Sequence, residues 1–434
     1  MKNATLKFHL IIALLFIITN LNAQDTIKVM QYNLLYYGWN TGWCTSENNN
    51  ISDKDGYLKK IVGYVKPDIF TVNEMGAKSS NIDHLQNSVL NVNTNKYKHA
   101  TYTNYSNSSY SSIVNMLYYN SEKLTLAHED VVTTSIRDIN IYKLYYNSSD
   151  LSTKRDTAYI TCIVAHLKAG SDDDEVKKRG VMVQTLMDYL NDINYSGNIL
   201  VMGDFNLYKS TEPAFQTLIN YSNPEIRFHD PINQIGSWHN NSYYSNYHTQ
   251  STHTSGCGCP STGGMDDRFD YILMTKPVID GTDKIQYING SYHALGQNGT
   301  FFNNSLLSST SRTIPDSVVN ALYNMSDHLP IITDLSVNQT HVSIKKKPLK
   351  INSFDFKLTN PVYDNLKLSV FNSSNSKKIN VSIISILGKT IFSKNYLSDN
   401  ETITLPVNSI QSGIYFVKVV DGEKRCVVKK FIKK

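Results

Sequence analysis

The spacing of apolar residues changes once along this chain of 434 residues, and no other feature constrains the fold as strongly. Between Thr26 and Val337, short strand-like apolar runs alternate with segments of helical spacing, such as residues 175–190. That alternation is typical of an α/β domain. Beyond residue 350 the apolar residues recur at every second position and no helical segment follows, which predicts a small all-β sandwich at the C-terminus.

The charge balance divides the chain at the same place. Residues 25–340 contain 23 Lys and Arg against 31 Asp and Glu, whereas residues 341–434 contain 17 against 6. The first part therefore has a net charge of −8 and the second a net charge of +11. An acidic domain does not hold a polyanion by bulk charge, so contact with phosphate groups would require metal ions. Between the two parts, KKKPLK at 345–350 has the composition of a linker.

The first 23 residues have the anatomy of a secretory signal peptide. Two lysines precede an apolar run at 10–18, and Ala23 offers a small residue for cleavage. The apolar run is too short to span a bilayer. A buried N-terminal helix is the alternative explanation. We favour the signal peptide, which predicts an exported protein.

The chain contains five cysteines, an odd number for an exported protein. Cys162 lies in the strand-like run YITCIVA, where we expect a buried free thiol. Cys257 and Cys259 share a Gly-rich loop that follows two histidines, so a zinc site is one possibility. Their one-residue spacing does not fit a usual zinc knuckle. We therefore favour a disulfide from this loop, with Cys44 as a candidate partner.

Polar residues mark the ends of several apolar runs. The clearest case is MGDFN at 202–206, where Asp204 and Asn206 stand two positions apart and face the same side of an extended chain. A turn would explain this fragment alone, because Gly, Asp and Asn favour turns after strands. In an α/β fold, however, residues from several strand ends meet at one edge of the sheet. The candidate site residues are Asn33, Glu74, His166, Asp204, Asn206, Asp270, Asp327 and His328.

The motifs around these residues resemble those of a known superfamily. In order along the chain they are VMQYNLL, KPDIFTVNEMG, AHLKAGS, VMGDFN, DDRFDYIL and SDHLPI. They are similar to motifs of the endonuclease/exonuclease/phosphatase superfamily, which includes pancreatic-type DNases, abasic-site endonucleases, neutral sphingomyelinases and inositol-phosphate phosphatases. The resemblance covers residues 26–337. It implies an α/β fold, a DNase-like four-layer sandwich of two β-sheets flanked by helices.

The resemblance also implies a divalent-metal site. Glu74 would be the main ligand, helped by Asn33, and Asp327 would lie beside the metal. Phosphodiester hydrolysis needs neutralisation of charge on phosphate oxygens, a deprotonated water and an acid for the leaving group. Oxygen ligands suit Mg²⁺, Mn²⁺ or Ca²⁺ better than zinc. We therefore expect one of these three ions as the cofactor.

The same resemblance assigns catalytic roles. Asp204 and Asn206 would hold or activate the attacking water and grip the phosphate. His328, oriented by Asp270, would act as an acid–base group or phosphate contact. His166 would donate to the phosphate or to the leaving oxygen.

One departure from the family pattern concerns His166. The motif HLKA is similar to the DNase and sphingomyelinase branches, whereas abasic-site endonucleases tend to use a tyrosine there. DNases orient this histidine with a glutamate that precedes the strand equivalent to SIVNMLYY. This chain has SYSS at that point and no acid. We therefore do not expect a carboxylate to orient His166 as in a DNase.

The C-terminal part resembles a second family. SGIYFVKV and the Lys-rich terminal strand are similar to the type A sorting domain of the Bacteroidetes type IX secretion system, over residues 359–434. The resemblance implies a partnership with that secretion machinery and a secreted or cell-surface protein exported through the periplasm. A carbohydrate- or surface-binding sandwich is the alternative. Tyr415 and Phe416 are adjacent, which indicates strand alternation rather than an aromatic binding face.

These observations lead to a domain plan and a leading hypothesis. The hypothesis is a secreted, metal-dependent phosphodiesterase, foremost a nonspecific nuclease that hydrolyses DNA or RNA. The alternatives are a phospholipid or sugar-phosphate hydrolase of the same fold, and a non-catalytic surface adhesin. We expect a monomer with a few local cations near the site, such as Lys168 and Arg268. The predicted parts are a signal peptide over 1–23, a catalytic domain over 24–340, a linker over 341–358 and a sorting domain over 359–434.

Overall fold

The computed structural model describes residues 25–105, 111–149, 151, 157–256, 258–337, 354–371, 378–386, 388–397, 402–422 and 425–434. The chain divides into two compact units, Met1–Val342 and Ser343–Lys434, and each is described by itself. The predicted signal peptide and the segment KKKPLK lie outside the described residues.

The first unit is built on two β-sheets. One sheet has the strand order β11-β13-β1-β2-β4-β3, and β12 also pairs with β13. In this sheet β1 pairs in parallel with β2 and antiparallel with β13. Its strands are β1 (Asp25–Tyr37), β2 (Ile69–Gly76), β3 (Tyr97–His99), β4 (Ile113–Asn120), β11 (Ile285–Tyr287), β12 (His293–Ala294) and β13 (Ile331–Val337).

The second sheet of this unit has the order β5-β6-β7-β8-β10-β9. Its central strands β7 and β8 run in parallel, and β8 pairs antiparallel with β10. Its strands are β5 (Leu124–Val132), β6 (Ile139–Tyr146), β7 (Tyr159–His166), β8 (Ile199–Asp204), β9 (Phe228–His229) and β10 (Asp270–Thr275). Strands β1, β2 and β4 contact β7, β8 and β10, so the two sheets pack face to face.

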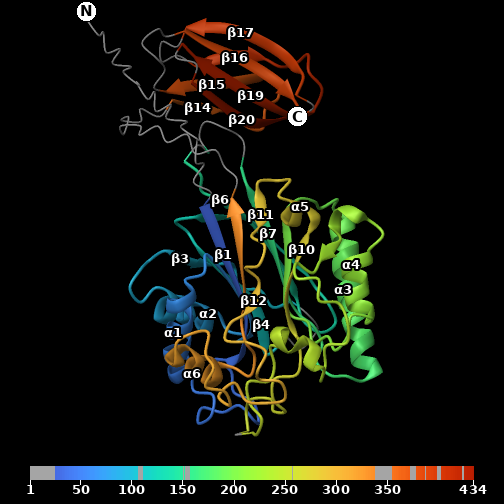
Figure 1. Ribbon diagram of the computed structural model, residues 1–434. Helices are drawn as coiled ribbons and strands as arrows, with labels where there is room; N and C mark the ends of the chain where they lie inside the picture. The colour runs from blue at the N-terminus through green and yellow to red at the C-terminus, as the bar shows by residue number, and fades with distance from the viewer. Residues whose placement is uncertain are drawn as a thin grey trace, which may run out of the picture. The chain divides into compact units, whose positions relative to one another are not determined.

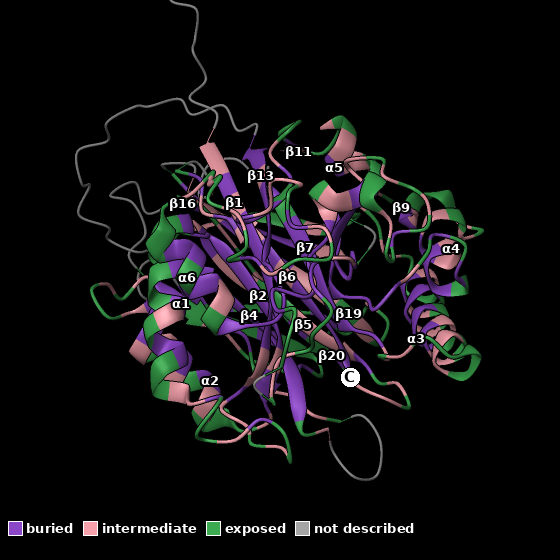
Figure 2. Cartoon of the chain, turned by 60° about the horizontal axis from the view of Figure 1, so that its bottom comes forward, coloured by how far each residue is buried: buried purple, intermediate pink, exposed green. Residues whose placement is uncertain are grey.

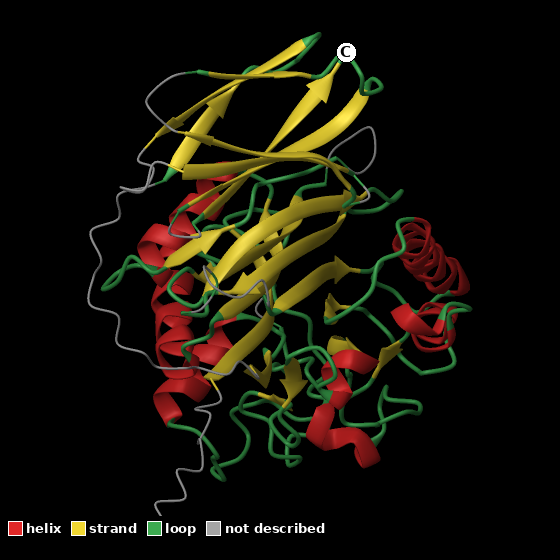
Figure 3. Ribbon diagram, turned by 90° about the horizontal axis from the view of Figure 1, so that it is seen from above, coloured by secondary structure: helices red, strands yellow, loops and turns green. Residues whose placement is uncertain are grey.

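Helices cover the outer face of each sheet. On the first sheet these are α1 (Ile51–Val65), α2 (Ser79–Leu85), the π-helical turn η1 (Gln86–Leu90) and α6 (Asp316–Met325); on the second they are α3 (Asp173–Asp192) and α4 (Pro213–Asn220). Figures 1 and 3 show these two groups of helices on opposite sides of the strands. Three short helices complete the unit: η2 (Pro224–Ile226), η3 (Ser242–Tyr247) and α5 (Lys276–Asp280). The predicted four-layer α/β fold is confirmed.

Strand alternation divides the core into two layers. On β8, Leu200 and Met202 face the first sheet, whereas Ile199 and Val201 pack beneath α3 and α4. Because both faces of β8 are covered, the whole strand is apolar until it reaches Asp204, as its sequence indicates. Figure 2 shows buried residues on the sides of α1 and α6 that face the sheet. No helix in the described part of the chain combines the length and apolar character needed to span a membrane.

The second unit is an all-β sandwich, as predicted. Its two sheets have the orders β14-β15-β18 and β17-β16-β19-β20. They share one apolar core, to which Leu366 and Leu368 contribute from one sheet and Val417 and Val419 from the other. The strands are β14 (Asp355–Leu358), β15 (Asn365–Phe371), β16 (Lys378–Ser385), β17 (Thr390–Leu397), β18 (Ile403–Pro406), β19 (Gly413–Asp421) and β20 (Cys426–Lys433).

The linker prediction extended too far toward the C-terminus. Residues 341–353 lie outside the described residues, but Asp355–Leu358 form β14. Phe356 of this strand is fully buried in the core of the sandwich, which gives the segment a packing role that a linker lacks.

Candidate active site

The eight polar residues that mark strand ends meet at one end of the two sheets. Asn33 on β1 and Glu74 on β2 lie near the carboxyl ends of parallel neighbours. His166 ends β7 and stands opposite Asp204, which ends β8. Asp270 begins β10 and pairs with Asp204 from the other side. Six of these eight residues are among those that line a cleft of about 510 Å³, namely Glu74, His166, Asp204, Asn206, Asp327 and His328. Asn33 and Asp270 lie fully buried.

Asn33 joins the two sheets at the base of the cleft. Its Nδ2 donates to Oε1 of Glu74 at 3.1 Å and to Oδ2 of Asp204 at 2.9 Å. Its Oδ1 accepts the backbone N–H of Leu35 at 2.9 Å. In this arrangement Asn33 presents its amide nitrogen to both carboxylates and holds them together. Its role as a metal ligand stays a prediction.

Several residues of the site adopt a backbone conformation that L-residues rarely take. Leu35, Tyr36, Glu74 and Asn206 have φ values of 43°, 52°, 56° and 50°. Left-handed residues other than glycine are uncommon and tend to gather at functional sites. The turn at Leu35 and Tyr36 aims both backbone N–H groups into the cluster, since the N–H of Tyr36 donates to Oε2 of Glu74 at 3.2 Å.

Lys54 supports that turn from beneath. It lies on α1, is 2% exposed, and donates through Nζ to the carbonyls of Leu34 and Leu35 at 2.7 and 2.6 Å and to Oδ1 of Asn49 at 2.6 Å. Burial lowers the pKa of Lys54 to about 7, although the negative charges of Asp327 and Glu74 oppose that shift. Sequence reasoning missed this residue, because a lysine on an amphipathic helix is expected to face solvent.

His328 is held by a buried carboxylate. Its Nδ1 donates to Oδ2 of Asp270 at 2.7 Å, and its Nε2 lies 3.7 Å from Oδ2 of Asp204. Burial opposes the charged imidazolium, but the charges of Asp270 and Asp204 outweigh burial and raise the pKa of His328 well above its ordinary value. Asp270 and His328 are therefore joined by a hydrogen bond, and the orienting role of Asp270 stays a prediction.

Gln250 is a second residue that the sequence did not reveal. Its Nε2 donates to Oδ2 of Asp327 at 3.1 Å and lies 2.7 Å from Nε2 of His328. The backbone N–H of Ser261 donates to the same oxygen of Asp327 at 2.9 Å. Both residues belong to the polar loop between η3 and β10, whose sequence carries no signal that distinguishes Gln250 from a surface glutamine.

A disulfide ties this loop to the segment after β1. Cys44 bonds to Cys259, as the sequence suggested, and Cys162 is a buried free thiol, also as predicted. The zinc alternative is wrong for Cys259, because its sulfur is bonded to carbon and sulfur and is not a thiolate. Cys257 lies outside the described residues.

No carboxylate of the described residues forms a hydrogen bond with Nδ1 of His166. Its Nε2 lies 3.6 Å from Oδ2 of Asp204 and 3.8 Å from Oε1 of Glu74. Its Nδ1 is buried with no hydrogen-bond partner among the described residues, which agrees with the missing acid in SYSS. Burial, followed by the positive charges of Arg137 and His328, lowers the pKa of His166 well below its ordinary value. Burial thus disfavours the charged form of the ring, whose Nε2 faces two carboxylates.

The cluster carries a buried excess of negative charge. Burial and the charge of Asp327 raise the pKa of Glu74, and burial, with Asp270 and Glu74, raises the pKa of Asp204 to about 7. Glu74, His166 and Asp204 each offer a ligand atom within 4.8 Å of the others. Asp327 adds a buried Oδ1 without a hydrogen-bond partner among the described residues. This set of mainly oxygen donors fits a divalent cation such as Mg²⁺, Mn²⁺ or Ca²⁺.

Of the two expected local cations, only Lys168 is available. The prediction for Arg268 is wrong, because its guanidinium is 1% exposed and forms a buried pair with Asp230 at 2.8 Å. That pair leaves no charge of Arg268 for a phosphate. Lys168 is partly exposed, and its Nζ lies 3.9 Å from Oε1 of Glu175.

Together these features define a four-layer α/β unit with a buried anionic site, and a separate β-sandwich unit. Residues 359–434 match the family model of the secretion system C-terminal sorting domain. This part of the chain is therefore a sorting domain, and it directs export through the type IX secretion system to the cell surface or the outside. The predicted sorting domain and localisation are confirmed. No curated protein matches the sequence.

Solved structures similar to the chain include a protein of the endonuclease/exonuclease/phosphatase family from Bacteroides thetaiotaomicron. The identity is 12%, the match covers 73% of this chain and 99% of that chain, and the TM-score is 0.46. The human Nocturnin catalytic domain with bound sulfate anion is 15% identical, over 73% and 98% of the two chains, with a TM-score of 0.42. TDP2 of D. rerio complexed with single strand DNA product is 12% identical, over 72% and 99%, with a TM-score of 0.44.

Proposed function

We propose that this chain is an exported, divalent-metal-dependent phosphodiesterase whose foremost substrate is a nucleic acid. The observation that carries the proposal is the His328–Asp270 pair, whose imidazole faces the buried carboxylate cluster across the cleft. An imidazole beside carboxylates provides groups for proton transfer and a cation-binding site within one cleft.

The cation would be held by Glu74 and Asp327, in the cleft that Asp204 and His166 also line. When bound, it would neutralise charge on a phosphate oxygen and acidify the attacking water. The proposed ligands, Glu74 and Asp327, supply carboxylate oxygens, which is the chemistry of magnesium and manganese sites rather than of structural zinc.

Residues of the chain itself would carry out proton transfer and bind the phosphate. Asp204, with its pKa raised to about 7, is suited to accept a proton from water near neutral pH. The backbone N–H of Asn206 donates to Oδ1 of Asp204 at 3.0 Å and keeps that carboxylate oriented. His328 would bind a phosphate oxygen or protonate the leaving oxygen, and Asp270 positions it. His166 would contact the phosphate through Nε2.

A phospholipid ester is the second candidate, and one observation favours it. Trp43 lines the cleft and is 76% exposed, and its neighbour Cys44 anchors it through the disulfide. A large exposed aromatic side chain beside a phosphodiester site is also what an interfacial enzyme would use to enter a lipid surface.

The two candidates are separated by initial rates of the purified protein in Mg²⁺. The substrates are plasmid DNA, RNA and sphingomyelin vesicles at equal phosphodiester concentration, with bis(p-nitrophenyl) phosphate as a small ester. Hydrolysis of the nucleic acids that stops on chelation supports the proposal. A sphingomyelin rate well above the DNA rate transfers the assignment to the lipid. No hydrolysis of any ester with Mg²⁺, Mn²⁺ or Ca²⁺ refutes the proposed function.

A further inference from the structure

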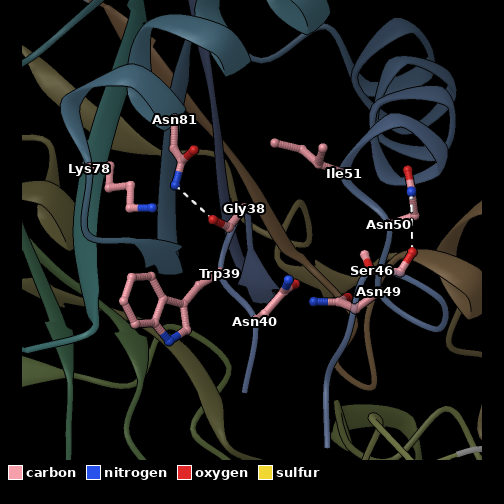
Figure 4. Close-up of a pocket in the computed structure, with 9 residues that line it drawn as sticks. All are labelled: Gly38, Trp39, Asn40, Ser46, Asn49, Asn50, Ile51, Lys78 and Asn81. Carbon is pink, nitrogen blue, oxygen red and sulfur yellow. Dashed lines mark hydrogen bonds between the residues drawn. The ribbon is translucent and has the colours of Figure 1, made fainter. Parts of the chain in front are cut away.

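The cleft that contains the carboxylate cluster adjoins further hollows on the surface. It shares Tyr36 and Thr41 with a second hollow, which is also lined by Arg137 and Lys168. That hollow shares Trp39 with a third pocket of about 470 Å³, shown in Figure 4. The three hollows therefore follow one another along the segment after β1.

Asparagine side chains stabilise the rim of the third pocket through hydrogen bonds to the backbone. Nδ2 of Asn81 donates to the carbonyls of Gly38 and Gly76 at 3.0 and 3.1 Å, which joins the segment after β1 to the segment after β2 (Figure 4). Nδ2 of Asn50 donates to the carbonyl of Ser46 at 3.2 Å, and its Oδ1 accepts the N–H of Ser52 at 2.8 Å at the start of α1. The side-chain amides of Asn81 and Asn50 therefore stabilise the walls of the pocket.

Three other side chains of the pocket form no side-chain hydrogen bond or ion pair with the described residues. Trp39 offers its indole ring, Asn40 an exposed amide, and Lys78 an exposed ammonium 5.5 Å from the centroid of that ring. Lys78 has no ion pair among the described residues. The pocket also adjoins the N-terminus of α1 at Ile51, where the helix dipole favours negative charge. An aromatic face beside a cation and an amide suits a base with its phosphate.

Aromatic side chains line all three hollows, and lysines line two of them. Tyr36 and Trp43 line the first cleft, Tyr36, Trp39 and Lys168 the second hollow, and Trp39 and Lys78 the third pocket. Aromatic platforms alternating with a few cations are typical of grooves that bind single-stranded nucleic acid. A duplex contacts many phosphates and would need more cations than this acidic unit offers here. A lipid chain would need an apolar wall, which the amide-lined third pocket lacks.

We propose that the three hollows form one groove for single-stranded nucleic acid, in which Trp39 and Lys78 bind a nucleotide remote from the scissile phosphate. The inference rests on the proposed function for the scissile step but makes a separate statement about binding. It adds a substrate class and two specificity-determining residues, Trp39 and Lys78, to the candidate active site.

The test compares Trp39→Ala, Lys78→Ala and the double variant with the unaltered full chain. The matched control is Lys276→Ala, because Lys276 begins α5 after Thr275, at the end of β10 opposite Asp270. Two substrates are used in Mg²⁺: a single-stranded oligothymidylate of about 12 nucleotides, within the usual range of site sizes, and bis(p-nitrophenyl) phosphate. The measured quantity is the ratio of their kcat/KM values.

We expect Trp39→Ala to lower that ratio by about tenfold, since stacking of one base contributes roughly 1–3 kcal/mol, and Lys78→Ala to lower it through the loss of a phosphate contact. Lys78→Ala should also flatten the log–log salt dependence of oligonucleotide binding by about 0.7, the contribution of one phosphate contact to a single strand. Lys276→Ala should change neither quantity. A distortion of the fold would not remove one phosphate contact selectively.

Binding is also measured without turnover, by fluorescence anisotropy of the labelled oligonucleotide. Weaker binding by the double variant supports the groove even if no ester is hydrolysed, so failure of the proposed function is distinguishable. An unchanged ratio and unchanged anisotropy in the double variant overturn the groove. Equal losses on both substrates, or tighter binding of duplex than of single strand by the unaltered chain, also overturn it.

Discussion

Replacement of Asp270 by asparagine isolates one charge in the candidate site. Asp270 is fully buried, its Oδ2 accepts from Nδ1 of His328 at 2.7 Å, and its backbone N–H donates to Oγ1 of Thr249 at 3.2 Å. An asparagine has the same size and can accept the same hydrogen bond through its amide oxygen. Asp270→Asn therefore keeps the ring of His328 in place while it removes the charge that favours the imidazolium.

The expected magnitude follows from the hydrogen bond itself. A bond to a charged group contributes about 1.5–3 kcal/mol, against about 0.5–1.5 kcal/mol for a neutral pair. The difference of roughly 1–1.5 kcal/mol corresponds to about one pKa unit of His328. Because Asp270 raises the pKa of His328, its neutralisation lowers that pKa. Asp270 also raises the pKa of Asp204, so that value should fall as well.

The sign of the pH effect is the same for both groups. If His328 acts in its protonated form, activity is lost as pH rises through its pKa, so a lower pKa moves the alkaline limb of the rate profile to lower pH. If Asp204 acts as the base, activity is gained as pH rises through its pKa, so the acid limb also moves to lower pH. The whole profile of kcat/KM should therefore shift down by about one unit.

The assay measures kcat/KM on bis(p-nitrophenyl) phosphate in Mg²⁺ from about pH 5 to pH 10, a range that covers both limbs. Asp334→Asn is the matched control, since Asp334 pairs with Lys28 at 2.7 Å near the other end of β1. Its profile should superimpose on that of the unaltered protein. A superimposable profile for Asp270→Asn, or a shift to higher pH, would refute the assignment of His328 and Asp270.

Four further predictions follow from the same structure. Chelation should abolish hydrolysis and Mg²⁺ or Mn²⁺ should restore it, while Glu74→Gln should need far more metal; full activity in a chelator would contradict the metal site. His328→Ala and Asp204→Ala should each lower kcat by a factor on the order of 10²–10⁴ with unchanged circular dichroism; near-normal turnover would show that the site lies elsewhere. Lys54→Met removes the Nζ donor from the carbonyl of Leu34 and from Oδ1 of Asn49, at about 1–3 kcal/mol each, while the carbonyl of Leu35 still accepts from Nδ2 of Asn49 at 3.1 Å, so urea denaturation should show a lower free energy of unfolding; an unchanged midpoint would remove its supporting role. Deletion of residues 345–434 should retain hydrolysis in cell fractions but abolish release, as measured by activity in medium and periplasm; normal release would disprove the export role of the sorting domain.

Much of the fold could be predicted because it depends on local periodicity. The run NILVMGD predicts a strand covered on both faces, and β8 is that strand, with each face packed in a different core layer. The C-terminal alternation likewise predicts the sandwich. The boundary failed at β14, although Phe354, Phe356 and Leu358 alternate there and pack in the core, because the domain was placed where the resemblance to the sorting domain begins, at residue 359.

The candidate site could likewise be predicted from the sequence only in part. Position at strand boundaries suggested all eight candidate residues: the parallel pairs β1–β2 and β7–β8 bring their carboxyl ends to one edge, and the antiparallel strands β10 and β13 begin there. It did not reveal Gln250 or Lys54, whose residue types are common on surfaces and whose contacts with the site depend on tertiary packing. It also misplaced Arg268, because sequence proximity to Asp270 does not say that the guanidinium turns inward to Asp230.

The sequence by itself therefore determined the order of strands and helices, the two-part organisation, and the polar residues carried to the strand ends. These are properties of short segments, set by the alternation of apolar and polar side chains. Only the tertiary structure decided which loops reach those strand ends and which charges remain accessible. The hydroxyl of Ser326 donates to the carbonyl of Asn33 across 293 positions, and Cys44 bonds to Cys259 across 215. Contacts of that range depend on how the two sheets pack, and packing leaves no periodic trace in the sequence.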